Sequence, residues 1–274
     1  MKTLTFYFMM CFLFAMQALN GQQDHPVDWL RELPRGLEPD HSRPGTYLMT
    51  TDYLEYDLSG RFKGKMRVTA EYTCGLENGA VRWNKVRVAR SQEPGETFPE
   101  GELQESMEGF TYVPSEKVVT EEFFREIPQI GVELKNLVWD MLGLEVFAYR
   151  KWDDLELNRE IRAEDINSVV DLAGQGSFEN RDVRLTWLGI TRINGEVCAI
   201  IKYSAMNNLL NMETEQFRMK GRSHYWGEVF VSLKDRQIEY ATLAEDVITD
   251  IVVPGYPENI LGYTVRHITL KKIL

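Results

Sequence analysis

The sequence predicts an α+β protein in which a long, curved, mostly antiparallel β-sheet, or open half-barrel, carries a helical insertion packed on one face. Three features of the 274-residue chain support this prediction. Long runs alternate apolar and polar side chains, which is the period of a strand with one buried face. Turn-forming residue pairs separate several of these runs. Between the early and the late strands, one segment has its apolar side chains at helical spacing.

The first 21 residues have the composition of a secretory signal peptide. Lys2 is followed by an apolar run from Leu4 to Ala18, and small or polar residues then lead to Gly21. The run is shorter than the ~20 residues that span a bilayer. We therefore expect an exported protein, periplasmic or secreted and of bacterial type, with cleavage after Ala18 or Gly21 and no transmembrane segment in the mature chain.

Residues 22–45 predict a proline-rich N-terminal lead-in. Prolines lie among charged residues at positions 26, 34, 39 and 44, which favours an extended segment or a loosely docked arm, with one helical turn near Trp29. The pairs Asp24–His25 and Asp40–His41 contain metal-binding residue types. Because no third ligand stands at a fixed spacing from either pair, we interpret both as solvated loop.

Residues 46–274 predict a single β-rich domain. Its longest strand, Arg61–Cys74, alternates throughout. Asn78–Gly79 turns the chain, and Val81–Arg90 pairs back with a change of parity near its middle that indicates a β-bulge. Later in the chain, Asn194–Gly195 between two apolar runs is the sequence of a tight hairpin turn.

The helical insertion covers about residues 119–149. Its longer segment, Val132–Tyr149, places Leu137, Val138 and Met141 on one apolar stripe at i, i+3 and i+4 spacing. A stripe of this kind is first of all a packing face. We therefore expect it to lie against one face of the sheet.

The clearest hairpin spans residues 222–243, where two β-branched and aromatic runs flank Lys234–Gln237. If these four residues form the loop, Trp226 faces Glu245 on the next strand. One face of the first strand then carries Arg222, His224, Trp226, Glu228, Phe230 and Ser232. The other face is the expected core face, with Ser223, Tyr225, Gly227, Val229, Val231 and Leu233.

Cys74 and Cys198 are the two cysteines that remain after removal of the signal peptide. An oxidising compartment permits a disulfide between them. Free cysteine also behaves as a small apolar residue in protein cores. Since a bridge needs Cα atoms within ~7 Å of each other, a possible disulfide and two separate buried thiols both remain open.

Catalytic signatures are missing from the sequence. It contains no Gly-x-Ser-x-Gly elbow, no His-Glu-x-x-His, no Cys-x-x-Cys and no calcium-loop spacing. His224 and Glu228 share a strand face but lie ~13 Å apart, too far to hold one metal ion. We therefore predict no catalytic residues, no metal and no cofactor. The net charge of −11 also disfavours nucleic acid as a partner.

This order of elements, with long hairpins, central helices and hairpins again in an exported chain, resembles the open half-barrels of LolA/LppX-type periplasmic carriers of lipoproteins and lipids. The resemblance covers most of residues 46–274. Residues 222–233 are also similar to segments of uncharacterised exported bacterial proteins. The carrier resemblance implies an apolar cleft between sheet and helix, and no functional residue is transferred from it.

Three functions are compatible with these features. The first is an exported binding module that holds a lipid or other amphiphile between sheet and helix, in an unfilled apolar cavity of a few hundred Å³. Its candidate ligand-binding residues are His224, Tyr225, Trp226, Glu228, Phe230, Tyr240, Leu137, Val138 and Met141. The second is a cell-envelope structural or protein-interaction domain with an envelope protein as partner. The third is a hydrolase that uses His224 with Glu228 or Glu245.

Overall fold

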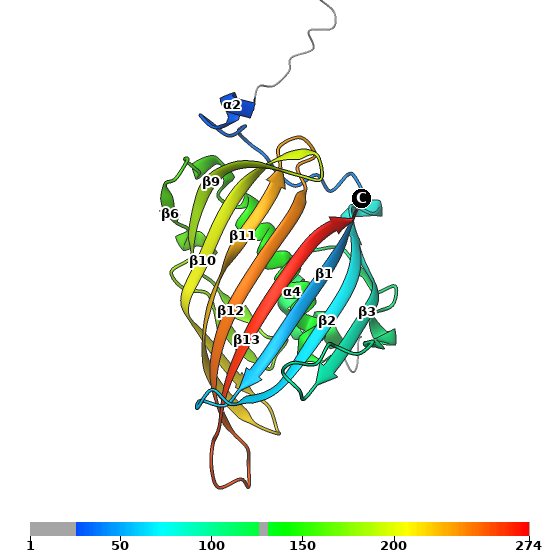
Figure 1. The fold of residues 1–274 in the computed structure, drawn as a ribbon, viewed down its shortest axis with the longest axis vertical. Coiled ribbons are helices and arrows are strands. Elements are labelled where there is room, and N and C mark those ends of the chain that lie inside the picture. The colour runs from blue at the N-terminus through cyan, green and yellow to red at the C-terminus, as the bar shows by residue number, and fades with distance from the viewer. Residues whose placement is uncertain (1–25, 126–130, 274) are drawn as a thin grey trace, which may run out of the picture.

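The computed structural model describes residues 26–125 and 131–273. In this part of the chain, 13 strands form one sheet that curves around the long helix α4 (Figure 1). The main strand order is β4-β3-β2-β1-β13-β12-β11-β10-β8-β7, with β5 on β3, β9 on β10 and β6 on β9. The two edges of the sheet do not pair with each other, so the predicted α+β open half-barrel is confirmed.

The chain builds the sheet in two halves. The first half is β1 (Gly45–Tyr56), β2 (Phe62–Cys74), β3 (Val81–Ser91), β4 (Glu102–Leu103) and β5 (Thr111–Tyr112). The second half is β6 (Glu160–Arg162), β7 (Val169–Asp171), β8 (Gly176–Glu179), β9 (Arg184–Ile193), β10 (Glu196–Glu213), β11 (Arg218–Ser232), β12 (Ile238–Val252) and β13 (Ile260–Ile273). Antiparallel pairing of β1 with β13 joins the two halves.

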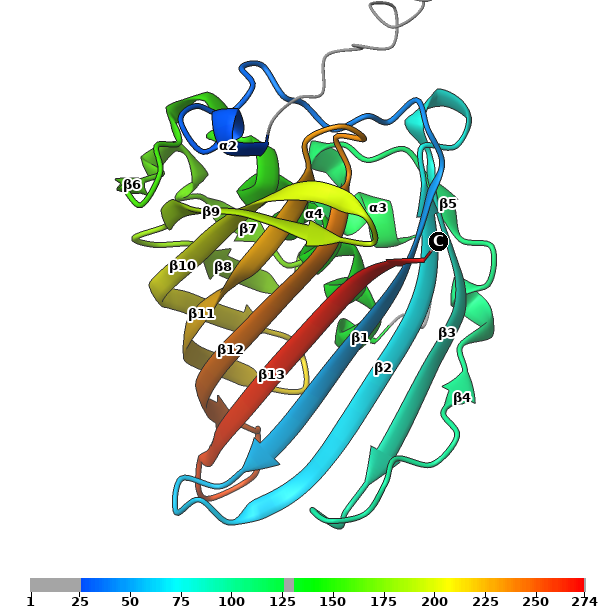
Figure 2. The same cartoon turned by 45° about the horizontal axis from the view of Figure 1, so that its top comes forward.

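Within the described residues, three α-helices connect or precede these halves, namely α2 (Pro26–Trp29), α3 (Glu121–Arg125) and α4 (Val132–Tyr149). α4 lies along the concave, inner face of the sheet (Figure 2). Its apolar side chains pack there, and Leu137 and Leu144 are fully buried. None of the helices in the described ranges is long and apolar enough to cross a membrane.

The alternation of strand side chains sets which residues meet α4. On β11 the inward residues include Tyr225, Val229 and Val231, as the sequence predicts for the core face. Two predicted local features are also confirmed. Asn194 and Gly195 form the β9–β10 turn with φ of +53° and +84°, and a bulge interrupts the pairing of β2 with β3.

The predicted register of the β11–β12 hairpin is wrong by one residue. Trp226 pairs with Ala244 rather than with Glu245. The loop is formed by residues 233–236 rather than by Lys234–Gln237, and a bulge beside it leaves Glu239 without a partner on β11. Because a one-residue shift moves a side chain to the other face of a sheet, Glu245 lies on the inner face.

The N-terminal lead-in is docked more firmly than the sequence predicts. Leu33 and Leu37 are buried. The Trp152 indole donates a hydrogen bond to the Pro34 carbonyl at 2.7 Å, and the Gly36 amide donates to Asp153 at 2.7 Å. The lead-in therefore lies against the segment that follows α4. The predicted signal peptide, residues 1–21, lies outside the described residues and stays a prediction.

Candidate functional site

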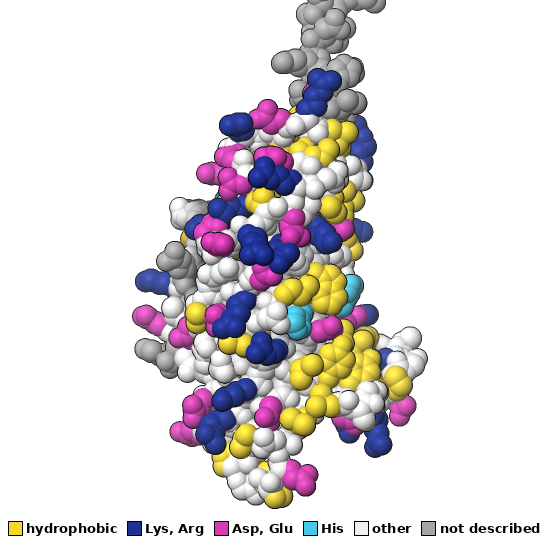
Figure 3. Space-filling model, turned by 90° about the vertical axis from the view of Figure 1, so that its left-hand side faces the viewer, with side chains coloured by type: hydrophobic (Ala, Val, Ile, Leu, Met, Phe, Trp, Pro, Cys, Tyr) yellow, Lys and Arg dark blue, Asp and Glu magenta, His cyan; other side chains and the backbone are white. Residues whose placement is uncertain are grey.

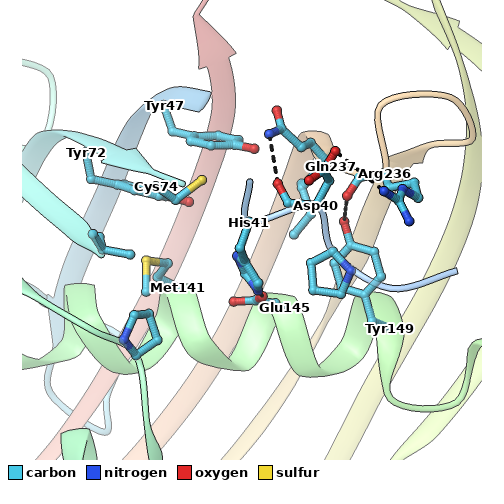
Figure 4. Close-up of a pocket in the computed structure, with 14 residues that line it drawn as sticks. Asp40, His41, Tyr47, Tyr72, Cys74, Met141, Glu145, Tyr149, Arg236 and Gln237 are labelled. Atoms are coloured by element: carbon cyan, nitrogen blue, oxygen red, sulfur yellow. Dashed lines mark hydrogen bonds and ion pairs between the residues drawn. The ribbon is translucent and has the colours of Figure 1, made fainter. Parts of the chain in front are cut away.

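A cleft opens where the C-terminal half of α4 meets the inner face of the sheet (Figure 4). Its enclosed volume is about 50 Å³, and the space including the open mouth is about 480 Å³. The residues that line it come from the lead-in, from β1 to β3, from the segment after β5, from α4 and from the β11–β12 hairpin. They are Pro39, Asp40, His41, Tyr47, Tyr72, Cys74, Val81, Pro114, Met141, Glu145, Tyr149, Arg236, Gln237 and Ile238.

Residues 39–41, here called the strap, cross the mouth of the cleft (Figure 4). The Asp40 amide donates a hydrogen bond to the Arg236 carbonyl at 3.1 Å. The side-chain amide of Gln237 donates to the Arg43 carbonyl at 2.9 Å, just beyond the strap. The Tyr149 hydroxyl donates to the same Arg236 carbonyl at 3.0 Å. The β11–β12 loop is therefore the common anchor of the strap and of the end of α4.

One ion pair links the strap to α4. His41 Nε2 lies 2.9 Å from Glu145 Oε1, and the His41 side chain is 45% exposed. The hydrogen bond to Glu145 raises the pKa of His41 above its usual value, against the opposing effect of partial burial. The contact is therefore strongest when His41 is protonated.

The floor of the cleft is aromatic and apolar. Tyr47 and Tyr72 stack with ring centroids 4.9 Å apart and an angle of 13°, and Tyr72 lies 4.8 Å from Trp83. Burial holds the pKa of both tyrosines well above the usual range, so they remain neutral. Burial also raises the pKa of the Cys74 thiol, and a protonated thiol is a poor nucleophile. The floor offers apolar contact rather than reactive groups.

A buried ionic cluster lies beneath α4. Arg266 on β13 donates hydrogen bonds to Asp140 on α4 and to Glu245 on β12, each at 2.5 Å. Glu245 also accepts a hydrogen bond from the Ser223 hydroxyl at 2.5 Å. The Arg266 guanidinium lies 5.2 Å from the centroid of the Tyr53 ring. The cluster therefore ties the helix to four strands of the inner face.

The ionic cluster is not fully satisfied. Within the described residues, Arg266 Nε has no hydrogen-bond partner. Burial raises the pKa of Asp140 to about 6, although Arg266 opposes that effect. A buried donor without a partner costs ~1–3 kcal/mol. This cost offsets part of the free energy that the helix α4 gains from its apolar contacts with the sheet.

The predicted ligand-binding residues lie on opposite faces of the sheet. Tyr225, Leu137, Val138 and Met141 lie on the inner side, and of these only Met141 lines the cleft. Leu137 and Val138 are buried in close packing between α4 and the sheet. The Tyr225 ring lies 5.7 Å from Phe147, and its hydroxyl donates to Asn180 at 2.6 Å.

The other predicted residues lie on the outer face. His224, Trp226, Glu228, Phe230 and Tyr240 alternate with the buried positions of β11 and β12. Trp226 is 39% exposed, and Phe230 and Tyr240 pair with ring centroids 5.6 Å apart. Figure 3 shows histidine and apolar side chains gathered on the outer surface of the molecule. These residues do not face the cleft.

The structure places His224 and Glu245, one of the two pairs in the hydrolase hypothesis, on opposite faces of the sheet. His224 Nδ1 accepts a hydrogen bond from the Asn207 amide at 3.2 Å, whereas Glu245 is on the inner face with Ser223 and Arg266. Among the residues that the structure describes, no group of three or more His, Cys, Asp or Glu side chains is placed to hold a metal ion.

Cys74 on β2 and Cys198 on β10 are both free thiols. β1, β13, β12 and β11 lie between their strands in the sheet. The bridge that the sequence allows does not form in this structure, because the curvature of an open half-barrel does not bring these strands together. Cys198 is buried, and burial raises its pKa to about 12.

Several residues of the cleft were not predicted. The sequence indicates a solvated loop at Asp40–His41, yet His41 contacts Glu145 and Asp40 contacts the β11–β12 loop. The proximity of the strap to Arg236 and Gln237 depends on contacts almost 200 positions apart in sequence. Met141 is the one cleft residue that the sequence pattern did indicate, because it belongs to the apolar stripe of the predicted helix.

Comparison with known proteins identifies no family. No family model and no curated protein matches the sequence. Among solved structures, a lipovitellin structure described as "lipid-protein interactions in lipovitellin" aligns with 87% of this chain at 12% identity and a TM-score of 0.44. The aligned region covers 25% of the length of that lipovitellin chain. A DUF1329 family protein from Desulfovibrio piger aligns over 85% of this chain and 88% of its own, at 11% identity and a TM-score of 0.17.

Proposed function

We propose that the protein is an exported binding module that holds an apolar or amphiphilic molecule, such as a lipid, between α4 and the inner face of the sheet. The observation that supports this proposal is the composition of the cleft, where aromatic and aliphatic side chains line one part and the charged or amide side chains come from the strap, Glu145 and the β11–β12 loop. An amphiphile matches that arrangement, because its chain would lie on the walls and its polar group at the mouth.

Binding requires the cleft to widen. The enclosed volume of about 50 Å³ is smaller than the ~300–1,000 Å³ of typical ligand sites. The unfilled cavity of a few hundred Å³ that a binding module of this kind was expected to have is therefore not preformed, because Leu137 and Val138 fill the space under α4. A ligand would bind by favouring a state in which the strap or α4 has moved outward.

Two features of the site favour such a movement. The strap is held over the mouth by a few hydrogen bonds and by the partly exposed pair of His41 with Glu145. Beneath α4, Arg266 Nε is buried without a partner among the described residues, which reduces the stability of the docked helix. Both features involve polar groups. The polar group of a ligand can therefore form hydrogen bonds in place of those that the movement breaks.

A first test is native mass spectrometry of the mature protein after export to a bacterial periplasm, with solvent extraction of bound molecules. The proposal predicts a stoichiometric amphiphile that leaves the protein on extraction. A ligand-free mass in every preparation, together with no binding of added fatty acids or phospholipids, would contradict it. The same material reports the mature N-terminus and so tests cleavage near Ala18 or Gly21.

A second candidate function is an envelope protein-interaction domain. The observation that favours it is the outer face of the sheet, where Trp226 is 39% exposed and Ile248 is 52% exposed. Aromatic side chains on the outside of a soluble sheet are typical of contact surfaces. Site-specific photo-crosslinking from position 226 in cells, with the exposed position 105 next to β4 at the other edge of the sheet as the control, would identify a partner. Equal or absent crosslinking from both positions would exclude this surface.

A further inference from the structure

A second, polar pocket lies on the outer face of the sheet, away from α4. The loop of residues 92–101 folds back over β2 and β3. Lys65 Nζ donates hydrogen bonds to the Pro94 carbonyl at 3.1 Å and to the Glu96 carbonyl, and Arg87 Nη1 donates to the Gly101 carbonyl at 2.7 Å. Two cationic side chains of the sheet therefore hold the loop in place.

The space under this loop is not filled. It has a volume of about 160 Å³ and is lined by Arg67, Thr69, Arg87, Phe98, Pro99 and Gly101, with Ala89 beneath. That volume is roughly ten times the ~10–15 Å³ needed to hold one water molecule. The pocket therefore has room for a small polyatomic group.

The donors around the pocket are fixed in position. Arg67 forms a two-point ion pair with Asp52, at 2.6 and 2.7 Å, and the Phe98 ring lies 4.5 Å from its guanidinium carbon. These contacts set the plane of the Arg67 guanidinium and leave Nη1 free of protein acceptors in the described ranges. Fixed guanidinium groups lose little freedom when they bind an anion.

Arg87 has spare donors and an easily displaced partner. Its Nη1 lies 3.3 Å from Glu100, whose side chain is 85% exposed. Its Nε and Nη2 have no acceptor within the part of the chain that the structure describes. Exposed ion pairs contribute little, ~0–1 kcal/mol. An incoming anion can therefore replace Glu100 beside Arg87 at small cost.

We propose that this pocket binds a phosphate group, held by the Arg67 and Arg87 guanidinium groups and by the Thr69 hydroxyl. Two guanidinium groups from neighbouring strands and a hydroxyl offer charge-assisted donors from several directions, as a tetrahedral oxyanion requires. The group can belong to free phosphate or to a phospholipid headgroup. This site is separate from the cleft under α4, so it does not depend on the function proposed for that cleft.

The test compares Arg87→Gln with Arg82→Gln. Arg82 is an exposed arginine on the same strand that lies outside the pocket, so both variants lose the same charge. Inorganic phosphate is titrated by calorimetry at low ionic strength, with chloride matched. Binding to vesicles of phosphatidylglycerol is measured in parallel against phosphatidylcholine. Thermal unfolding confirms that both variants are folded.

The proposal predicts saturable binding of phosphate or of phosphatidylglycerol that weakens about tenfold or more in Arg87→Gln and is unchanged in Arg82→Gln. Phosphate binding without vesicle binding identifies a free phosphate or phosphate ester as the source. Vesicle binding that depends on Arg87 identifies a headgroup. Binding that is absent from the wild type, or equal in the two variants, would overturn the proposal.

Discussion

Asp140 on α4 and Arg266 on β13 form an ion pair of 2.5 Å beneath the helix, with side-chain exposures of 13% and 12%. Arg266 also neutralises Glu245 at 2.5 Å. The pair is one of the polar links between the helix and the inner face of the sheet. Because both side chains are buried, each charge depends on the other for compensation.

Removal of the arginine should destabilise the protein strongly. Arg266→Met leaves the Asp140 and Glu245 carboxylates buried without a cation. Loss of one partner from a buried pair costs ~3–5 kcal/mol. We expect a loss of that size in the free energy of unfolding measured with urea. The double variant Arg266→Met, Asp140→Leu should recover part of the loss, and a result without recovery would contradict the coupling between these residues.

The Asp140 pair also predicts a pH dependence. Burial raises the folded-state pKa of Asp140 to about 6, above the ordinary value of 3.8. A raised carboxyl pKa contributes stability that is fully present below pH 3.8 and is lost as the pH rises through about 6. The free energy of unfolding of the wild type should therefore fall relative to that of Asp140→Asn as the pH rises from 3.8 through about 6. Parallel profiles for the two proteins would contradict the assignment.

The attachment of the strap to α4 should also weaken as the pH rises, in this case near neutral pH. The hydrogen bond to Glu145 raises the pKa of His41 above the usual 6.5. The contact is present below that pH and is lost as the pH rises through the folded-state pKa. Hydrogen exchange of the strap amides should be slower at pH 5.5 than at pH 8 after correction for intrinsic rates. His41→Ala should abolish the difference, whereas Asp40→Asn leaves the Glu145 contact in place.

Trp226 and Trp83 should differ sharply in their effect on stability. Trp226 is 39% exposed on the outer face, whereas Trp83 is fully buried on the inner face. Trp83→Ala creates a core cavity and should cost ~3–5 kcal/mol. Trp226→Ala should cost less than ~1 kcal/mol. Denaturant unfolding compares them, and a loss above 3 kcal/mol for Trp226→Ala would mean that the outer face is covered.

Gly227 permits a close approach of β11 to β12. A Cβ atom there would lie 2.0 Å from the Thr242 carbonyl and 2.6 Å from the Tyr203 hydroxyl, which themselves form a hydrogen bond of 2.7 Å. Gly227→Ala should therefore cost at least ~1–3 kcal/mol. Gly95→Ala is the control, since no atom lies within 4 Å of its Cβ position. Equal stability of the two variants would contradict the close packing.

The fold was predictable because alternation and helical spacing are local. The same rule placed Tyr225 inward and Trp226 outward. Local patterns did not reveal the bulge at Glu239, which moved Glu245 inward, because a bulge changes register without changing composition. They also did not reveal the cleft, because His41, Met141 and Arg236 come together only through the curvature of the sheet.

The measurement that tests the proposed function most directly is titration with a fluorescent fatty acid probe of the wild type, Met141→Trp and Met219→Trp. Met141 lines the cleft, whereas Met219 pairs with Ile251 at the far end of β11. The bulky side chain at position 141 should fill the cleft and weaken probe binding at least tenfold, while Met219→Trp binds like the wild type. Equal binding by both folded variants, or no binding by the wild type, would contradict an amphiphile site under the strap.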